Sequence, residues 1–372
     1  MSTISLDSAI KRRGWIKEGL LQETANSFWH PFTSMGDSSI IKQANDARQD
    51  AGHNVVFQYR GNHTVTPIEG RDTAFGKGKD KKVFSSKIEI RRFRFPIDNG
   101  DVFDGVDIND LTLSQHSDSR SLLADGFSRW KDQMYFDCGQ GIIDSFTSSH
   151  EVDLGTTFGY DELLDLAEST RTGKFGTKYR RPLKPYRTEN GEDCYFIVLD
   201  AYSATMLRKD SDFKTVIQHA DVRGNNNRLI KGVFGKINNL YLVEAPTHSG
   251  SVLNDATGTT MQFRDVEVEI AGLRRKDAND VWTGQKGYVT TGAQYSYNLL
   301  LGANAFQTAF GRMPDYKFQQ SMDFGIKSES ALEVWMNTQK TKLTNETGED
   351  YVAAKVSDMD YGVVTIKLKT QS

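Results

Sequence analysis

The sequence predicts an α+β fold, and three observations support this class. Residues 54–59 and 83–95 are rich in β-branched and aromatic side chains with the period of strands. Residues 119–143 carry apolar side chains at steps of three and four, as in a long helix. Residues 194–200 form a continuous apolar run that suits a central strand covered on both faces. The chain therefore mixes strands and helices without a regular alternation of the two.

Length and composition bound the class further. The 372 residues exceed one average domain, so we expect two sub-domains. Hydrophobic residues make up 37% of the chain, which suffices for a core. The net charge of −3 argues against a dedicated nucleic-acid binder. Cys138 and Cys194 cannot build a disulfide framework and are expected as buried thiols. Without a signal-peptide or membrane-spanning pattern, we expect a soluble protein made in the cytosol.

Residues 1–52 are expected to form an N-terminal arm. Trp15 belongs to a stretch whose apolar residues recur at helical spacing among basic residues. A basic amphipathic helix can bind a membrane surface, but this apolar stripe is short. We therefore favour an arm that packs on another protein surface.

Residues 53–97 are expected to form a long β-hairpin. Its two strand-like runs flank a tip rich in glycine and lysine, residues 73–82. A hairpin of this length has too little core of its own to be stable alone. The sequence therefore predicts that the hairpin lies on another surface.

Further elements follow from local patterns. Ser117 or Ser119 is available as N-cap of the long helix. Asn238-Asn239 predicts a tight turn between two strands. The remaining expected elements are helices at 161–169 (ending before Gly173), 203–208, 210–219 and 297–310, and strands at 233–237, 240–243, 261–270, 352–356 and 362–368.

No pattern in the sequence indicates catalysis or a bound cofactor or metal. The glycines and lysines at 76–79 lack the spacing of a phosphate-binding loop, and Asp323-Phe324-Gly325 lacks the other kinase motifs. No two histidines have the i, i+4 spacing of a helical metal site. We therefore expect a protein that is not an enzyme.

The arm, the hairpin and the long helix offer more surface than a compact monomer needs. Elements of this kind are satisfied by neighbouring copies, and head-to-tail contacts close into rings or shells. The sequence thus predicts self-assembly. The candidate residues for contacts between subunits are Lys77, Lys79, Lys81, Lys82 and Trp15.

Four strings, taken in order, resemble the major capsid proteins of tailed double-stranded DNA phages with the Hong Kong 97-type fold. More narrowly, they are similar to the Enquatrovirus-type (N-four-like) capsid family. The strings are Leu123 to Trp130; Asp200-Ala201-Tyr202 to Phe213; Gly224 to Glu244 with its punctuating glycines; and Leu299 to Ala305 followed by Asp360-Tyr361-Gly362-Val363-Val364.

The resemblance implies a division of the chain. Residues 1–52 would be the N-terminal arm and residues 53–97 the extended hairpin called the E-loop. Residues 98–193 and 311–372 would form the peripheral domain with its long spine helix, and residues 194–310 the axial domain.

The resemblance also implies a function. The protein would build an icosahedral shell of hexamers and pentamers around the phage genome, in a virion assembled in the host bacterial cytoplasm. Partners would be other copies of itself, the portal, scaffold or decoration proteins, and packaged double-stranded DNA through weak non-specific contact, with no membrane. Alternatives are an encapsulin-like protein compartment of the same fold and a soluble enzyme with a flexible flap.

Some relatives join a hairpin lysine covalently to a neighbouring asparagine. That chemistry needs a lysine made neutral by desolvation. Lys77, Lys79, Lys81 and Lys82 crowd one glycine-rich tip beside Asp80 and are expected to be hydrated and charged. The sequence therefore favours electrostatic docking without covalent links between subunits.

Overall fold

The computed structural model describes most of the chain. The described residues are 19–44, 54–60, 67–78, 83–101, 108–142, 151–175, 178–179, 182–189, 191–220, 233–245, 272–277, 282–283, 293–322, 327–343 and 359–370. The strands expected at 261–270 and 352–356 lie outside these ranges.

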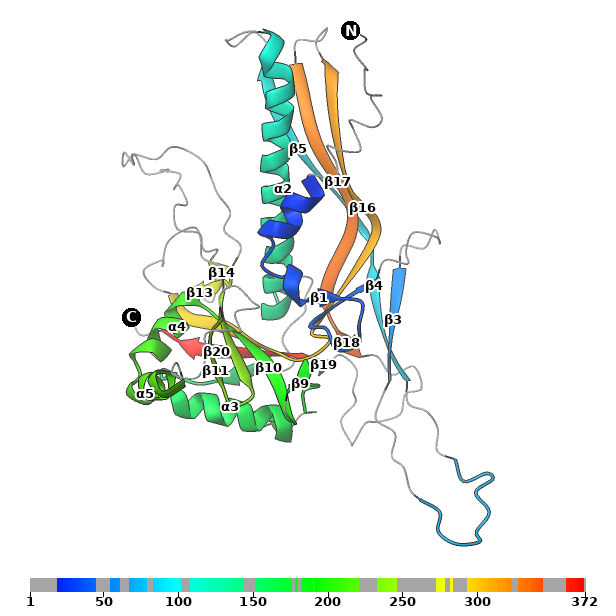
Figure 1. The fold of residues 1–372 in the computed structure, drawn as a ribbon, viewed down its shortest axis with the longest axis vertical. Coiled ribbons are helices and arrows are strands. Elements are labelled where there is room, and N and C mark those ends of the chain that lie inside the picture. The colour runs from blue at the N-terminus through cyan, green and yellow to red at the C-terminus, as the bar shows by residue number, and fades with distance from the viewer. Residues whose placement is uncertain are drawn as a thin grey trace, which may run out of the picture.

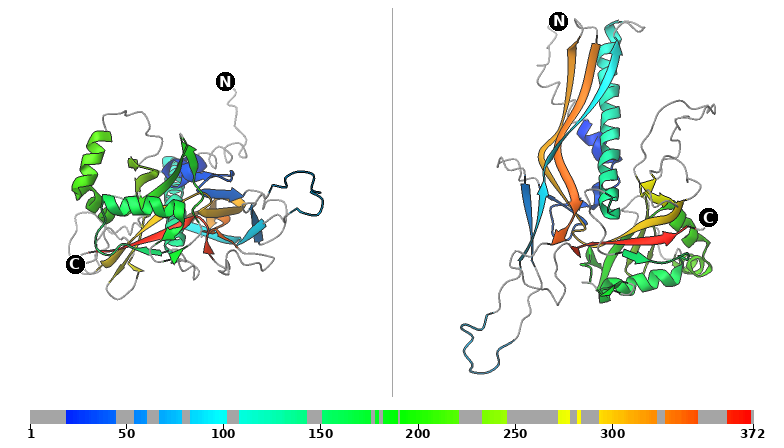
Figure 2. Two further views of the ribbon diagram at one scale, coloured as in Figure 1. Left: turned by 90° about the horizontal axis from the view of Figure 1, so that it is seen from below. Right: turned by 180° about the vertical axis from the view of Figure 1, so that it is seen from behind.

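The molecule has two lobes and a projecting hairpin (Figure 1). One lobe is elongated and pairs the long helix α2 with long strands. The other is a mixed sheet covered by three short helices. Views from behind and from below show the tip segment, residues 67–78, standing off from both lobes (Figure 2). The α+β class is confirmed.

The long helix α2 spans Ile108–Gln140, 33 residues, or about 50 Å at 1.5 Å per residue. It begins eleven residues before the expected start, so neither Ser117 nor Ser119 is its N-cap. Instead, Ser119 lies within the helix and donates a hydrogen bond to the side chain of Asn99 on strand β5. Residues 108–119 include several Asp, Asn and Ser, which favour caps and turns over helix interiors. The sequence pattern therefore did not predict a helix in this part of the chain.

Helix α2 packs on a five-stranded sheet of order β1-β2-β16-β17-β5. Its residues Leu123 and Phe127 contact the apolar side of β5 and β17. The ring of Trp130 lies 4.7 Å from that of Phe93 and 5.0 Å from that of Phe95, so Trp130 faces this sheet. The strands are β1 (Thr33–Ser34), β2 (Ile41–Ala44), β5 (Arg91–Asp101), β16 (Phe306–Met322) and β17 (Lys327–Lys340).

The second lobe is built on a nine-stranded sheet in which β10 (Glu192–Leu199) is central, as expected. Helices α3 (Tyr160–Thr172), α4 (Ala201–Lys209) and α5 (Ser211–Ala220) pack with one face of it. Its other strands are β6 (Glu151–Asp153), β9 (Arg187–Glu189), β11 (Val233–Ile237), β12 (Leu240–Glu244), β13 (Arg275–Asp277), β14 (Trp282–Thr283), β15 (Ala293–Leu301) and β20 (Val363–Lys369).

Local signals in this lobe were interpreted correctly. Helix α3 ends at Gly173, whose φ of 73° suits glycine at a helix C-terminus. Strands β11 and β12 are antiparallel and turn at Asn238, which has a φ of 49°. Helices α4 and α5 begin within two residues of the expected positions.

The helix expected at 297–310 is wrong. This segment forms the end of β15, a corner at 302–305 and the start of β16. Leu299 and Leu300 pair with β10 on one side and β20 on the other, so this strand is surrounded by protein. A short apolar run buried on both faces cannot be distinguished from a helix by periodicity. A Cβ at Gly302 would lie 2.6 Å from the Lys184 carbonyl oxygen, so the corner requires glycine.

The structure also groups some segments differently from the expected division. The hairpin consists of β3 (Asn54–Arg60) and β4 (Val83–Glu89), whereas β5 after Ile90 pairs with β17. Strands β6 and β20 join the nine-stranded sheet rather than the helix α2 lobe. Two small sheets complete the fold: β7 (Lys174–Phe175) with β8 (Lys178–Tyr179), and β18 (Lys342–Leu343) with β19 (Met359–Asp360).

Candidate functional site

The root of the hairpin is fixed to the elongated lobe. Strands β3 and β4 pair in register from Asn54↔Glu89 to Arg60↔Val83. Alternation along the strands puts one set of side chains inside and leaves Val56 and Val83 exposed. The inward set packs against residues of the lobe: Phe57, Tyr59, Phe84 and Ile88 contact Ile90, Ala309 and Tyr361.

Polar contacts fix the same root. The Tyr59 hydroxyl donates to Gln307 Oε1 at 3.2 Å, and Gln307 Nε2 donates to Ser86 Oγ at 2.6 Å. The Lys42 ammonium lies 5.0 Å from the centre of the Tyr59 ring. Burial raises the pKa of Tyr59 above its ordinary value, so this hydroxyl stays protonated and remains a donor. The hairpin therefore leaves the lobe from a rigid base.

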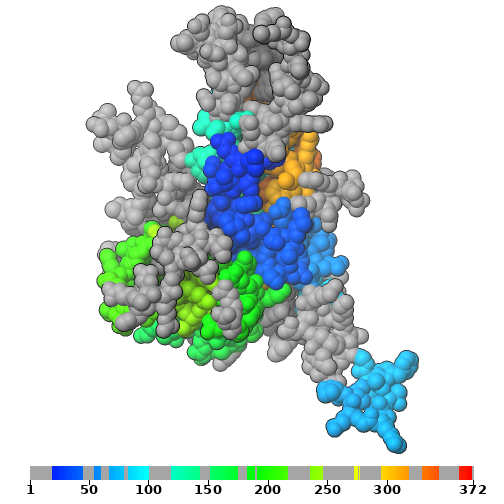
Figure 3. Space-filling model, viewed as in Figure 1, coloured from blue at the N-terminus to red at the C-terminus, as the bar shows by residue number. Residues whose placement is uncertain are grey.

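The tip of the hairpin, residues 67–78, has no comparable support. A turn closes it, with the Lys77 N–H donating to the Ala74 carbonyl at 3.2 Å and Gly76 at a φ of 79°. Phe75 is 95% exposed at this turn. Figure 3 shows the segment as a separate projection at the lower right. The Phe75 ring is therefore covered by almost nothing in its own copy.

Of the predicted contact residues, the structure describes Lys77. Its ammonium lies 3.2 Å from Asp72 Oδ2, and both side chains are at least half exposed. The Lys77 side chain is thus exposed to water in a surface ion pair. Lys79, Lys81, Lys82 and Trp15 lie outside the described residues.

A second feature is the junction between the lobes, which the sequence analysis missed. Residues 19–26 are helical and lead through the short helix η1 (His30–Phe32) to β1 and β2. Trp29 is fully buried here. Its ring lies within 6 Å of five other aromatic rings: Phe28, Phe32, Tyr135, Phe136 and Phe306. The dense aromatic string at 28–32 was the available signal.

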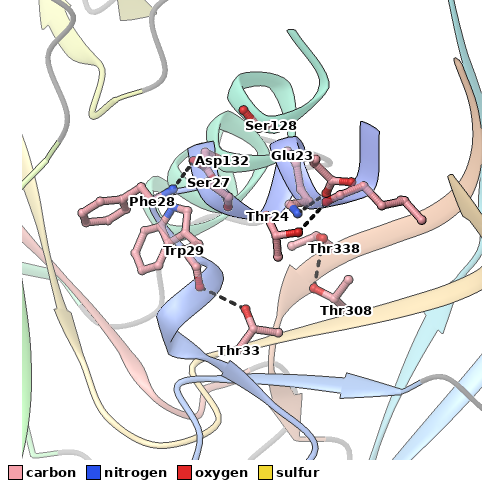
Figure 4. A network of polar contacts seen from close by, with 12 residues as sticks. Glu23, Thr24, Ser27, Phe28, Trp29, Thr33, Ser128, Asp132, Thr308 and Thr338 are labelled. Atoms are coloured by element: carbon pink, nitrogen blue, oxygen red, sulfur yellow. Dashed lines mark hydrogen bonds and ion pairs between the residues drawn. The ribbon is translucent and has the colours of Figure 1, made fainter. Parts of the chain in front are cut away.

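Hydrogen bonds and an ion pair hold this segment against helix α2 (Figure 4). Asp132 accepts hydrogen bonds from Ser27 Oγ at 2.7 Å and from the Phe28 N–H at 2.6 Å. Burial raises the pKa of Asp132 to about 6, because these donors only partly offset the loss of water. Beside it, the ammonium of Lys131 lies 2.5 Å from Glu23 Oε1. Burial is the largest influence on Lys131 and lowers its pKa, but Glu23, Tyr135 and Asp132 together outweigh burial, and the pKa is raised.

A buried ion pair lies near the hairpin root. Lys340 Nζ lies 3.2 Å from Asp360 Oδ2, and both side chains are essentially inaccessible to water. Burial lowers the pKa of Lys340, although Asp360 opposes this. The pair connects β17 to β19, so its position is structural.

The described ranges contain neither a cluster of metal-ligating side chains nor a membrane-spanning helix. No group of three or more His, Cys, Asp or Glu residues has the arrangement of a metal site in the part of the chain that the structure describes. Among the described residues, no helix is long and apolar enough to cross a membrane.

Comparison with solved structures is decisive for the fold. The capsid of Ralstonia phage GP4 aligns with a TM-score of 0.65 at 19% identity, over 93% of this chain and 92% of that one. The capsid of Helicobacter pylori bacteriophage KHP30 gives 0.65 at 16% identity, over 93% and 91%. The cyanophage Pam1 capsid gives 0.57 at 14% identity, over 100% and 99%.

The chain has the fold of phage capsid proteins. No protein-family model matches the sequence, and no curated protein matches it significantly. At these identities the likeness concerns the fold, that is, the arrangement of helices and strands.

Proposed function

We propose that this chain is a major capsid protein that assembles into the icosahedral shell of a tailed phage around its double-stranded DNA. The observation that carries the proposal is the match of nearly the whole chain to phage capsid structures, over nine-tenths of both partners. A local motif shared with many folds could not produce such coverage.

The projecting hairpin supports the same proposal. Its root is packed and its tip is bare, which is the arrangement of an element that reaches a second molecule. In a head-to-tail contact each copy gives a projection and receives one, and the series closes into rings. Lys77, with Lys79, Lys81 and Lys82, would dock on acidic groups of the neighbouring copy.

The division of the chain is proposed in a revised form. The E-loop would be β3, β4 and the residues between them. The peripheral domain would be α2 with β5, β16 and β17, and the axial domain the nine-stranded sheet with α3, α4 and α5. Placement in the Enquatrovirus-type family rests on the four sequence strings.

The remaining features of the proposal follow from this role. The protein would act in the virion after assembly in the host cytoplasm, without catalysis. Portal, scaffold or decoration proteins would bind to the shell, and packaged DNA would contact it weakly. Because the tip lysine Lys77 is hydrated, the subunits would not be joined covalently, so boiled particles should give one band at monomer mass.

The test is expression of the full chain, alone and with the scaffold protein of its own phage where one exists. Size-exclusion chromatography and electron microscopy should show rings or shells. A folded monomer under all salt and scaffold conditions would overturn the proposal. The ratio of absorbance at 260 and 280 nm of particles purified from infected cells then separates a DNA-filled shell from an encapsulin-like compartment that holds protein.

A further inference from the structure

The buried pair of Lys340 and Asp360 has an amine and a carboxyl group at contact distance without water. Nζ of Lys340 lies 3.2 Å from Oδ2 of Asp360, and the two side chains are 0% and 1% exposed. By comparison, Lys317 is 41% exposed in its ion pair with Glu333. The Lys340 pair is therefore shielded from the solvent that hydrates a surface ion pair.

Backbone contacts hold the two partners close together. Strands β18 and β19 pair at Lys342↔Asp360. The Tyr361 N–H donates to the Thr341 carbonyl at 2.9 Å, so the residues that follow Lys340 and Asp360 are bonded to each other. The nitrogen and the carboxyl group are thus kept within reacting distance, which replaces the chance encounter of two free groups.

Burial also changes the protonation of the pair. Two charges in a site without water carry a large desolvation penalty, and transfer of one proton from the ammonium to the carboxylate removes it. Burial lowers the pKa of Lys340, against the opposing influence of Asp360. The site therefore favours a neutral amine beside a neutral carboxyl group, and a neutral amine is a nucleophile.

We propose that Lys340 and Asp360 become joined by an amide bond within one chain. The Nζ amine attacks Cγ of Asp360, the bond from Cγ to the hydroxyl oxygen breaks, and the hydroxyl leaves as water with a proton from the nitrogen. One ammonium and one carboxylate thus give one amide and one water molecule, so no oxidant or other reactant is needed. The reaction requires only the folded chain and is independent of the proposed function.

The amide connects the two lobes of the molecule. Lys340 is the last residue of β17 in the five-stranded sheet, and Asp360 is the last residue of β19, which leads into β20 of the nine-stranded sheet. The ring of the adjacent Tyr361 lies 5.6 Å from that of Tyr59 in the hairpin root. Like a disulfide, the bond restricts the unfolded chain and so stabilises this junction.

Mass spectrometry of the denatured full chain tests the bond. The intact mass should be lower by one water molecule than the mass of the unmodified chain. A tryptic digest should contain a branched peptide that joins residues 328–342 to residues 356–367, uncleaved after Lys340. The internal control is Lys317, whose Nζ lies only 2.5 Å from Glu333 Oε2 but is exposed to water, and which should be cleaved normally.

Full cleavage after Lys340, together with the mass of the unmodified chain, would overturn the inference. A branched peptide at Lys317 would also overturn it, because exclusion of water would then not be what selects the pair. Fragmentation of the branched peptide locates the bond and separates it from water lost by an aspartate elsewhere.

Two matched variants give an independent measurement. Lys340→Arg keeps the positive charge but removes the amine, so this variant should retain the full mass. Lys342→Arg makes the same change two residues along the chain and should still lose one water molecule. A loss of water that persists in Lys340→Arg, or one that disappears in Lys342→Arg, would assign the reaction to another group. If Lys340→Arg does not fold, the wild-type digest decides alone.

Discussion

The junction around Trp29 and the tip around Phe75 place their aromatic side chains in opposite environments. Both are short aromatic-bearing segments without a core of their own. Trp29 lies buried among five aromatic rings between the two lobes, whereas Phe75 lies almost fully exposed on a projecting turn. An aromatic residue that a single copy covers stabilises the fold, whereas one that a single copy leaves bare is available for assembly.

This contrast predicts the largest effect for Trp29→Ala. Removing a fully buried indole should lower the free energy of unfolding by about 3–5 kcal/mol. Denaturant unfolding of the full chain measures the change. Phe75→Ala is the matched control and should leave the midpoint unchanged, because no surface of the same copy covers its ring. Similar losses in both variants would show that the tip belongs to the core.

The second prediction concerns Asp132 of helix α2, which accepts hydrogen bonds from Ser27 and Phe28 beside Trp29. Its folded-state pKa of about 6 lies above the ordinary 3.8, so the folded chain holds more protons than the unfolded chain between these values. Its contribution to stability is therefore greatest below pH 4 and falls as pH rises to 6, by about 3 kcal/mol at most. Asp132→Asn should remove this decline while preserving the acceptor for the Phe28 N–H.

Unfolding midpoints measured at half-unit steps from pH 4 to 7 test this. The difference between Asp132→Asn and the wild type should shift in favour of the variant as pH rises. A constant difference across the range would mean that Asp132 titrates normally in the folded chain.

The contribution of Glu333 to stability should depend on pH in the opposite sense to that of Asp132, and it should be smaller. It accepts hydrogen bonds from Lys317, Arg92 and Trp335, which lower its pKa to about 2. Its stabilisation is present above pH 4.5 and lost as pH falls toward 2. Because Arg92 and Lys317 are each nearly half exposed, Glu333→Gln should cost only about 1 kcal/mol at pH 7. The difference between wild type and variant should vanish near pH 2, and a loss that persists there would indicate a packing effect.

The sequence could predict those parts of the fold that leave a signal in neighbouring residues. Elements with local signals were found: α3 with Gly173 at its end, the turn at Asn238, and the central strand β10. Residues 297–301 form a strand where the sequence predicts a helix, because both faces of the strand are buried: Leu300 lies in one core cluster, and Leu299 and Leu301 lie in the other. Burial on both faces removes the alternation that identifies a strand. Strand partners distant in sequence leave no local pattern.

In the candidate site, too, the sequence predicted the features that have a local signal and missed those that depend on residues distant in sequence. The glycine-rich tip with Lys77 was visible because its composition is local. The junction was not, because the groups that bury Trp29 and hold Ser27 lie on α2 and β16, about a hundred residues or more away in sequence.

The smallest effect on folding should come from shortening the tip. Deleting Gly76 to Lys82 removes a turn whose described residues, 76–78, contact little: a Cβ at Gly76 or Gly78 would meet nothing within 4 Å. The root keeps its contacts from Phe57, Tyr59 and Ile88, so the free energy of unfolding should change by less than about 0.5 kcal/mol. Particle yield should fall strongly, since the deletion displaces Phe75 from its place at the turn. A deletion that unfolds the chain would mean that the tip is part of the core, and one that assembles normally would mean that the subunits are held by other surfaces.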